Sequence, residues 1–314
     1  MIKKALIVSI KGIKLSNKEK LLLSKEKPWG LILFKRNIKS LKQIKNLIID
    51  IRKYAMDKKF PVLIDEEGEY VSRLTNIFDH KINANFFGNL YKYDQKFALS
   101  IYKQYLKSIC KNLREIGINI NTTPVLDVLR KNTNKIIGKR SFSENKEIVK
   151  FLGKITIKEC RFQKIISVIK HIPGHGCSKT DSHLRMPNVD LEEKVLNKID
   201  FYPFKSSTAK LAMTAHILYS KIDSKNVSTF SEKIIKNIIR KKIGFKGILM
   251  SDDISMKALK YDLVTNAKKT LKAGCNLVLY CAGNIQDNFK LIKSVPYIDK
   301  FTAKKTSEIY KILR

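Results

Sequence analysis

The sequence predicts a single (β/α)8 barrel that spans residues 1–314. Eight short apolar runs alternate with segments of helical periodicity, which is the element order of a parallel barrel. The runs are rich in leucine and β-branched residues rather than alternating with polar ones, as expected for strands buried on both faces. No linker rich in Gly, Pro or Ser divides the chain, so we predict one domain. A doubly wound open sheet is the alternative fold.

The predicted strands are the apolar runs themselves. The first run is too short for the apolar core of a signal peptide, and no small-residue cleavage site follows it, so it is interpreted as a strand. Hydrophobic residues make up 44% of the chain, which is enough for a sizeable core. The strands are predicted at residues 5–10, 31–34, 62–64, 118–122, 165–170, 211–216, 247–251 and 276–281.

Helices are predicted between these strands wherever apolar residues recur at helical spacing. Residues 41–55 carry an apolar face of this kind, and residues 97–116 and 300–314 form two further helices. In a fourth helix, at residues 231–242, Ser231 is the expected N-cap and Gly244 the expected stop. The alternation of strand and helix therefore continues to the end of the chain.

The chain is strongly basic, with 63 Lys and Arg against 28 Asp and Glu and a formal net charge of +35. Such a charge favours a nucleic acid or an anionic surface as a partner. The lysines, however, are spread over almost every predicted helix, and no aromatic platform for bases accompanies them. We interpret the charge as the solvated surface of a protein from an AT-biased genome, with no specific nucleic acid partner. A polyanion-binding protein on an inactive barrel is the alternative.

Two further features bear on the compartment. No apolar run reaches the roughly 20 residues needed to span a bilayer. We therefore predict no membrane contact and a cytoplasmic location. The five cysteines are an odd number without a CxxC pair, which indicates free thiols in a reducing compartment.

The segment at residues 170–183 is the strongest candidate for a functional site. It contains three of the chain's five histidines, and Pro173, Gly174 and Gly176 prevent it from being helical. Polar residues also follow other predicted strands, and the carboxyl ends of barrel strands meet at one pocket. These residues are Asp65, Glu66, Glu67, Arg73, Asp127, Arg140, His216, Asp252 and Asp253.

Two kinds of ligand are weighed for this segment. Phosphate binding by a Walker A loop would need glycine at the positions of Pro173 and Ser178. A hydrolytic metal site would need a helix to align the first two histidine rings, and the Pro-Gly break forbids one. The ligands of such a metal site would be His171, His175, Asp181 and His183.

General acid/base catalysis is the third possibility. His183 would transfer the proton, and Asp181, two residues away, would orient its ring. Asp252 follows a buried strand and could be the nucleophile, attacking an oxocarbenium-like centre. Cys177 is an alternative nucleophile within the loop.

Three motifs follow one another along the chain. They are Lys-His-Ile-Pro-Gly-His-Gly from Lys170, Asp-Ser-His ending at His183, and Gly-Ile-Leu-Met-Ser-Asp-Asp-Ile-Ser-Met around Asp252. They resemble glycoside hydrolase family 3, and more narrowly its bacterial β-N-acetylglucosaminidases of peptidoglycan recycling. The resemblance extends from residue 30 to residue 275. It implies a (β/α)8 barrel that acts in the cytoplasm on a small carbohydrate, without a metal or other cofactor.

The resemblance also implies roles for individual residues. Asp252 matches the family's nucleophile, His183 its general acid/base, and Asp181 the partner of that histidine. The positions implied to bind the non-reducing N-acetylglucosamine are Asp65, Arg73, Arg140, Lys170 and His171.

The implied reaction is the retaining removal of terminal N-acetylglucosamine from GlcNAc-anhydro-MurNAc, with or without peptide. A β-glucosidase-type or a phosphorolytic member of the same family is the alternative. We expect a monomer.

The chain departs from the family pattern after the third predicted strand. The family usually has Asp-Gln-Glu-Gly-Gly-Arg-Val there, whereas this chain has Asp-Glu-Glu-Gly-Glu-Tyr-Val from Asp65. Glu69 and Tyr70 thus replace a glycine and an arginine. The loss of the glycine matters if that position needs a positive φ. The three residues implied to be catalytic, Asp181, His183 and Asp252, are all present, so we expect an active enzyme.

Overall fold

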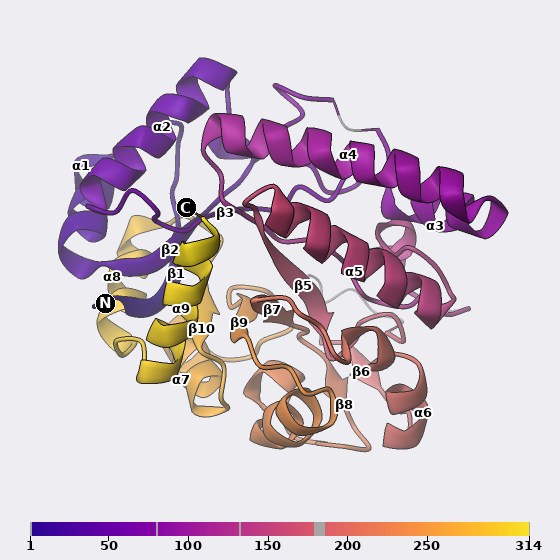
Figure 1. The fold of residues 1–314 in the computed structure, drawn as a ribbon. Coiled ribbons are helices and arrows are strands. Elements are labelled where there is room, and N and C mark those ends of the chain that lie inside the picture. Colours follow the sequence, from indigo (N-terminus) through magenta and orange to yellow (C-terminus); the bar gives the residue numbers. More distant parts are fainter. Residues whose placement is uncertain (1, 80, 132, 179–185, 314) are drawn as a thin grey trace.

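A computed structural model describes residues 2–79, 81–131, 133–178 and 186–313. Within these residues, eight parallel strands close into a barrel in the order β1-β10-β9-β7-β5-β4-β3-β2 (Figure 1). The predicted fold class is therefore confirmed, and each predicted strand overlaps one strand of the barrel. The barrel strands are β1 (Lys4–Ser9), β2 (Pro28–Leu33), β3 (Val62–Ile64), β4 (Ile120–Asn121), β5 (Ile166–Ile172), β7 (Leu211–Thr214), β9 (Ile248–Asp253) and β10 (Leu277–Leu279).

The inside of the barrel is filled by apolar side chains from successive strands. Ile7, Leu63, Val168, Met213 and Met250 belong to one buried cluster there. Their neighbours on the same strands, such as Val8 and Val62, point outward and belong to the layer under the helices. Because successive side chains of a strand point to opposite faces, burial on both faces requires the unbroken apolar runs seen in the sequence.

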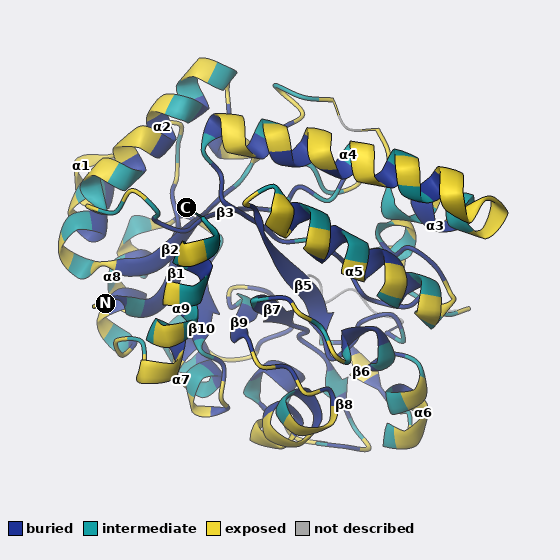
Figure 2. Cartoon of the chain, viewed as in Figure 1, coloured by how far each residue is buried: buried dark blue, intermediate teal, exposed yellow. Residues whose placement is uncertain are grey.

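The helices form the outer layer, with buried residues on their inward faces and exposed residues on their outward faces (Figure 2). In α2, Ile44, Leu47, Ile48 and Ile51 are buried, as the spacing predicts. The longer helices are α2 (Leu41–Tyr54), α3 (Ala84–Tyr93), α4 (Gln95–Ile116), α5 (Lys146–Phe162), α7 (Leu263–Lys272), α8 (Ile285–Ser294) and α9 (Lys300–Ile312). The shorter helical segments are α1 (Asn17–Leu21), η1 (Leu22–Glu26), η2 (Lys35–Asn37), η3 (Gly138–Arg140), α6 (Glu193–Lys198), η4 (Tyr202–Phe204) and η5 (Ser228–Phe230).

The predicted helix at residues 231–242 is present but differently wound. Its main part, η6 (Ile234–Lys242), is a π-helix. Ser231 accepts a hydrogen bond from the Ile234 amide at 3.1 Å, and Gly244 ends the segment at φ +75°. Both predicted end signals therefore act where the sequence places them.

At their carboxyl ends, two strands of the barrel run further than predicted. β5 continues through Ile172, so Lys170 and His171 lie within a strand, and the Lys170–His171 and Ile172–Pro173 peptide bonds are cis. β9 continues through Asp253, because Leu279 of β10 pairs with Asp253. Asp252 is thus held in the sheet rather than on the loop that follows it.

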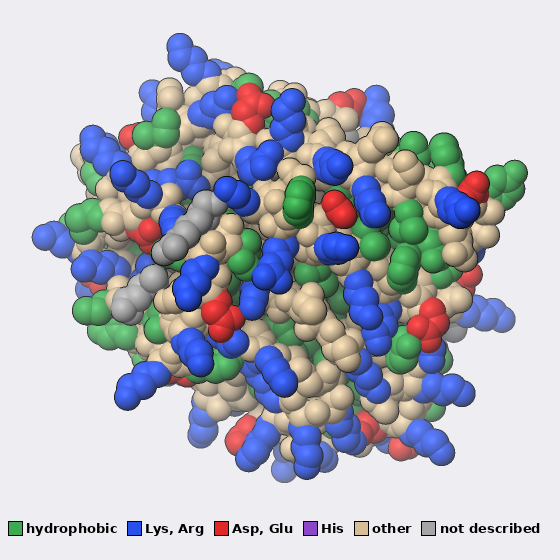
Figure 3. Space-filling model, viewed as in Figure 1, with side chains coloured by type: hydrophobic (Ala, Val, Ile, Leu, Met, Phe, Trp, Pro, Cys, Tyr) green, Lys and Arg blue, Asp and Glu red, His purple; other side chains and the backbone are tan. Residues whose placement is uncertain are grey.

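A small parallel sheet lies outside the barrel. β6 (Asn188–Val189) pairs with β8 (Leu218–Tyr219), joining the segment after β5 to the segment after β7. Among the described residues, none of the helices combines the length and apolar character needed to cross a membrane. Figure 3 shows Lys and Arg side chains scattered over one whole face, with Asp and Glu between them, rather than gathered in one block.

Candidate active site

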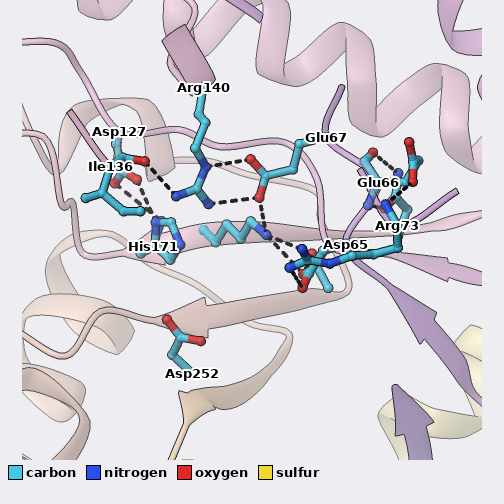
Figure 4. A network of polar contacts seen from close by, with 12 residues as sticks. Asp65, Glu66, Glu67, Arg73, Asp127, Ile136, Arg140, His171 and Asp252 are labelled. Atoms are coloured by element: carbon cyan, nitrogen blue, oxygen red, sulfur yellow. Dashed lines mark hydrogen bonds and ion pairs between the residues drawn. The ribbon is translucent and has the colours of Figure 1, made fainter. Parts of the chain in front are cut away.

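A cavity of about 250 Å³ lies at the carboxyl end of the barrel strands. Every predicted site residue that the structure describes lines it: Asp65, Arg73, Arg140, Lys170, His171 and Asp252. The other two, Asp181 and His183, lie outside the described residues. Figure 4 shows the polar network around this cavity.

Asp65, at the end of β3, is held between two cations. Its Oδ2 accepts a hydrogen bond from Arg73 at 3.0 Å, and its Oδ1 lies 3.3 Å from the ammonium of Lys170 on β5. Thr122 also donates to Oδ1. Burial opposes ionisation, but Lys170 and Arg73 outweigh it and hold the pKa of Asp65 far below its ordinary value. The carboxylate is therefore ionised at neutral pH.

Glu67 bridges the next two cations. Arg140 binds both of its carboxylate oxygens, at 2.7 and 2.9 Å, and Lys170 lies 2.5 Å from one of them. Burial opposes ionisation here too, but Arg140 and Lys170 lower the pKa of Glu67 to about 2. Arg140 is itself fixed by donating to the Ile136 carbonyl at 2.9 Å. Such paired and bidentate contacts give this part of the cavity a rigid pattern of donors and acceptors.

Glu66 lies behind this network and holds together the two ends of the loop at residues 66–74. Its Oε2 accepts hydrogen bonds from the amides of Arg73 and Leu74, at 2.9 and 3.1 Å. Its own backbone is locked to Asn121 of β4 by a pair of hydrogen bonds. Burial raises the pKa of Glu66 to about 7.

Asp127 anchors the histidines of the predicted segment. Its Oδ2 lies 2.7 Å from Nδ1 of His171, and its Oδ1 accepts from the amide of His175 at 2.6 Å. Burial disfavours the carboxylate, but His171 and His175 outweigh it and lower the pKa of Asp127. Since the carboxylate only accepts, Nδ1 of His171 must donate, and Nε2 is left for the cavity.

Asp252 projects into the cavity from β9, and Figure 4 shows it apart from the hydrogen-bonded cluster. Its Oδ1 accepts a hydrogen bond from the amide of Asp253 at 2.8 Å. Burial works against ionisation, yet His216 and His171 draw the pKa of Asp252 below its ordinary value. An ionised carboxylate with one backbone donor is thus exposed to whatever occupies the cavity.

His216 flanks Asp252 from the end of β7. Its Nε2 lies 3.0 Å from the carbonyl oxygen of Asp253, and its Nδ1 lies 2.7 Å from the hydroxyl of Thr229. Burial lowers the pKa of His216. Because a carbonyl oxygen only accepts, the neutral ring carries its proton on Nε2 and accepts at Nδ1.

Sequence reasoning singled out Glu67, Asp127 and His216 as polar strand-end residues but gave them no role. A signal for Glu67 was present, because Asp65 and Glu67 are two residues apart after a strand and point to the same side. Nothing comparable marks Asp127, whose partner His171 is 44 positions away.

The departure at Glu69 is accommodated. Glu69 is not among the residues with positive φ, whereas Gly68, which the chain keeps, has φ +129°. A Cβ on Gly68 would lie 2.3 Å from the Ile82 carbonyl oxygen. Glu69 instead donates its amide to that oxygen and accepts from Asn83 at 2.7 Å. The loop therefore keeps the glycine that its backbone requires.

Together these features define a (β/α)8-barrel protein with a binding site for a small polar ligand. A polar cavity at the carboxyl end of a (β/α)8 barrel, with fixed donors and acceptors on one side and an ionised carboxylate on the other, suits a small polyhydroxylated ligand.

Similarity to known proteins identifies the family to which this barrel belongs. The Glycosyl hydrolase family 3 N terminal domain matches residues 2–306. The beta-hexosaminidase of Haemophilus influenzae is 33% identical over 303 residues, covering 93% of this chain and 85% of that protein. The beta-hexosaminidase of Psychromonas ingrahamii is 30% identical over 303 residues, covering 93% of this chain and 88% of that protein.

A solved structure agrees with these relatives. NagZ from Neisseria gonorrhoeae, in complex with N-trifluoroacetyl-D-glucosamine, superposes with a TM-score of 0.89 at 28% identity, covering 98% of this chain and 90% of that one. The chain belongs to glycosyl hydrolase family 3. It is a glycoside hydrolase, as the resemblance of its motifs implied.

Proposed function

We propose that this enzyme is a retaining exo-β-N-acetylglucosaminidase. Its substrate is a peptidoglycan fragment, GlcNAc-anhydro-MurNAc with or without peptide, from which it removes the terminal N-acetylglucosamine. The observation that carries the proposal is the ionised Asp252 facing a cavity whose opposite side is a fixed array of charged donors and acceptors. The beta-hexosaminidase relatives support the sugar, and the complex of NagZ with an N-acylated glucosamine supports its N-acyl group.

In the proposed mechanism, the carboxylate of Asp252 attacks the anomeric carbon and forms a covalent glycosyl-enzyme. His183, supported by Asp181, protonates the leaving oxygen in the same step. His183 then deprotonates a water molecule, which releases the sugar and frees Asp252. The low pKa of Asp252 keeps the nucleophile ionised at neutral pH.

The sugar would be held by the charged side of the cavity. Asp65 accepts from sugar hydroxyls, Arg73, Arg140 and Lys170 donate to them, and His171 presents its Nε2 to them. The ion pairs within the protein fix the positions of these side chains, which limits the reorganisation needed when the sugar binds.

We further propose that residues 1–314 act as one catalytic domain, as a monomer in the cytoplasm, without a metal or other cofactor. The closed barrel running from β1 to β10, with α9 packed against it, supports the single domain.

The test is hydrolysis of an aryl β-N-acetylglucosaminide by the purified protein. The wild type should release the chromophore, and Asp252→Asn should lower kcat by roughly a thousandfold or more. His183→Ala should slow the reaction, and less so when the leaving group is good. Asp262→Asn is the matched control, because this exposed N-cap of α7 tolerates asparagine and should keep full activity. Full activity of Asp252→Asn would contradict the proposed nucleophile.

The two alternative activities, phosphorolysis and β-glucoside hydrolysis, can be told apart by their products and substrates. Phosphorolysis would produce a glycosyl phosphate when inorganic phosphate is added, and its absence removes that alternative. A β-glucosidase-type enzyme would prefer the aryl β-glucoside over the N-acetylated compound.

A further inference from the structure

Two cysteines that the proposed mechanism does not use lie against each other between α4 and α5. Cys110 is on the buried face of α4 and Cys160 on the buried face of α5, and the two helices lie side by side in the outer layer (Figure 1). The Cys110 thiol donates a hydrogen bond to the Cys160 sulfur at 3.6 Å. The structure describes all five cysteines, and among them this is the one pair of sulfurs in hydrogen-bond contact.

Both thiols are packed into the core. Cys110 is 1% exposed and Cys160 is 2% exposed. A buried thiol packs as a small apolar side chain, so packing accounts for each cysteine taken singly. A facing pair has in addition a chemistry that a single thiol lacks, because its two sulfurs can be oxidised to a disulfide.

A small cavity gives molecules of the size of water access to the two sulfurs. Its volume of about 40 Å³ is enough for about three water molecules. Besides the two cysteines, the aromatic side chains of Phe87, Tyr102 and Tyr105 line it. Glu67 and Arg140 line both this cavity and that of the candidate active site. Hydrogen peroxide is small enough to enter such a cavity, whereas a peptide disulfide such as oxidised glutathione is not.

The two thiols differ in their acidity. The hydrogen bond from Cys110 lowers the pKa of Cys160, although burial works against it, and the same contact raises the pKa of Cys110. The thiolate is the nucleophile in thiol oxidation. Cys160 is therefore the sulfur that reacts first, with the protonated Cys110 beside it.

We propose that Cys110 and Cys160 form an oxidation site, which hydrogen peroxide converts reversibly into a disulfide. The Cys160 thiolate attacks one peroxide oxygen, the O–O bond breaks, hydroxide leaves, and Cys160 becomes a sulfenic acid. The Cys110 sulfur then attacks the sulfenic sulfur. The S–S bond forms, the S–O bond breaks, and the departing hydroxide takes the Cys110 proton as water. In total the two thiols lose two electrons and two protons, and peroxide is reduced to two water molecules.

The disulfide would tie α4 to α5. The two sulfurs, now 3.6 Å apart, have to approach to about 2 Å. The cross-link would join positions 50 apart in the sequence, and a link across a loop of this length restricts the unfolded chain. The oxidised protein should therefore resist unfolding better than the reduced protein.

The test exposes the purified, fully reduced protein to a small excess of hydrogen peroxide at pH 7, followed by peptide mapping by mass spectrometry. We expect a cross-linked pair of peptides that contains Cys110 and Cys160 and is lighter by two hydrogen atoms than the reduced peptides together. Dithiothreitol should restore both thiols. Oxidised glutathione should leave both thiols reduced over the same time, because it does not fit the cavity. The urea midpoint of the peroxide-treated protein should rise by on the order of 1 M.

Cys275→Ser is the matched control. Cys275 is also buried, at 5% exposure, and its sulfur contacts no other thiol among the described residues. This variant should form the cross-link and gain resistance to urea as the wild type does. Cys110→Ser should form no cross-link and gain no resistance. Its Cys160 should instead stop at the sulfenic acid, which dimedone traps when the peroxide-treated variant is unfolded in urea.

Peroxide-treated wild type without a Cys110–Cys160 cross-link would overturn the proposal, and so would a cross-link between other cysteines in its place. This result does not depend on any variant folding. Oxidation by glutathione as fast as by peroxide would contradict entry through the small cavity. An equal gain in the urea midpoint for Cys110→Ser would show that the cross-link is not what stabilises the oxidised protein.

Discussion

The two sides of the candidate active site are built on opposite principles. On the side formed by β3 and β5, each carboxylate contacts two cations: Asp65 meets Arg73 and Lys170, and Glu67 meets Arg140 and Lys170. On the side formed by β7 and β9, Asp252 has one backbone donor, and the nearby His216 is held by uncharged partners.

We propose that this difference separates binding from reaction. Interlocked ion pairs fix the positions of donors and acceptors, which suits recognition of a ligand whose shape does not change. A carboxylate with few partners keeps its lone pairs available to a reacting carbon. The charged side, formed by β3 and β5, should therefore control stability and KM. The side formed by β7 and β9, which we call the sparse side because Asp252 has few partners there, should control kcat.

Breaking the charged side should have the largest effect on stability. Glu67→Gln would leave Arg140 and Lys170 without the charge that they share. Removing one member of a buried ion pair costs about 3–5 kcal/mol, so the free energy of unfolding should fall by about that amount. Urea unfolding at pH 7 measures it, and KM for the aryl glycoside should rise.

Glu115→Gln is the matched control for that substitution. Glu115 pairs with Lys45 at 3.1 Å on the surface, where an ion pair contributes less than about 1 kcal/mol. Equal destabilisation by Glu67→Gln and Glu115→Gln would mean that the buried network does not stabilise the cavity.

Glu66 sharpens the comparison, because its charge changes near neutral pH. Burial raises its pKa to about 7 from an ordinary value of 4.5. Between these two values the folded protein keeps a proton that the unfolded chain releases. The stabilisation is thus complete below pH 4.5 and is lost as pH rises through 7. Glutamine, which the family usually has at this position, carries no charge to bury.

The expected outcome is a pH-dependent advantage of Glu66→Gln. Its free energy of unfolding should match the wild type near pH 4.5 and exceed it at pH 8 by on the order of 3 kcal/mol, at 1.36 kcal/mol per pKa unit. Urea unfolding of both proteins across this range measures the difference, with Glu115→Gln as the control. A difference that does not change with pH would show that Glu66 stays ionised in the folded protein.

The same two sides explain what sequence alone could predict. The barrel was accessible because strands buried on both faces leave continuous apolar runs, so even the short β3 was found with its observed limits, Val62–Ile64. Strand ends were less accessible. The extension of β9 to Asp253 depends on its pairing with β10, which no local pattern reports.

Within the site, single residues were easier to predict than their partners. Lys170 and His171 stand in a distinctive motif. The carboxylate that Lys170 and Arg140 share belongs to Glu67, and its contact with Arg140 joins positions 73 apart. Such contacts follow from closure of the barrel, which brings the ends of distant strands together, and not from local spacing.

The smallest expected effect is on the sparse side. Thr229→Val would remove the hydroxyl that donates to Nδ1 of His216 while keeping the side chain's shape. The same hydroxyl also lies 2.8 Å from the Thr214 hydroxyl and 3.1 Å from the Ala215 carbonyl oxygen. A lost hydrogen bond of this kind costs about 1 kcal/mol, so we take about 1 kcal/mol as the lower end of the expected loss. The free energy of unfolding should fall by at least that amount, and kcat should fall more than KM rises, because His216 holds the strand end next to Asp252. Thr208→Val, at an exposed position before β7, should change neither quantity. A rise in KM at constant kcat would show that this side, too, serves binding, and the division between the two sides would then be wrong.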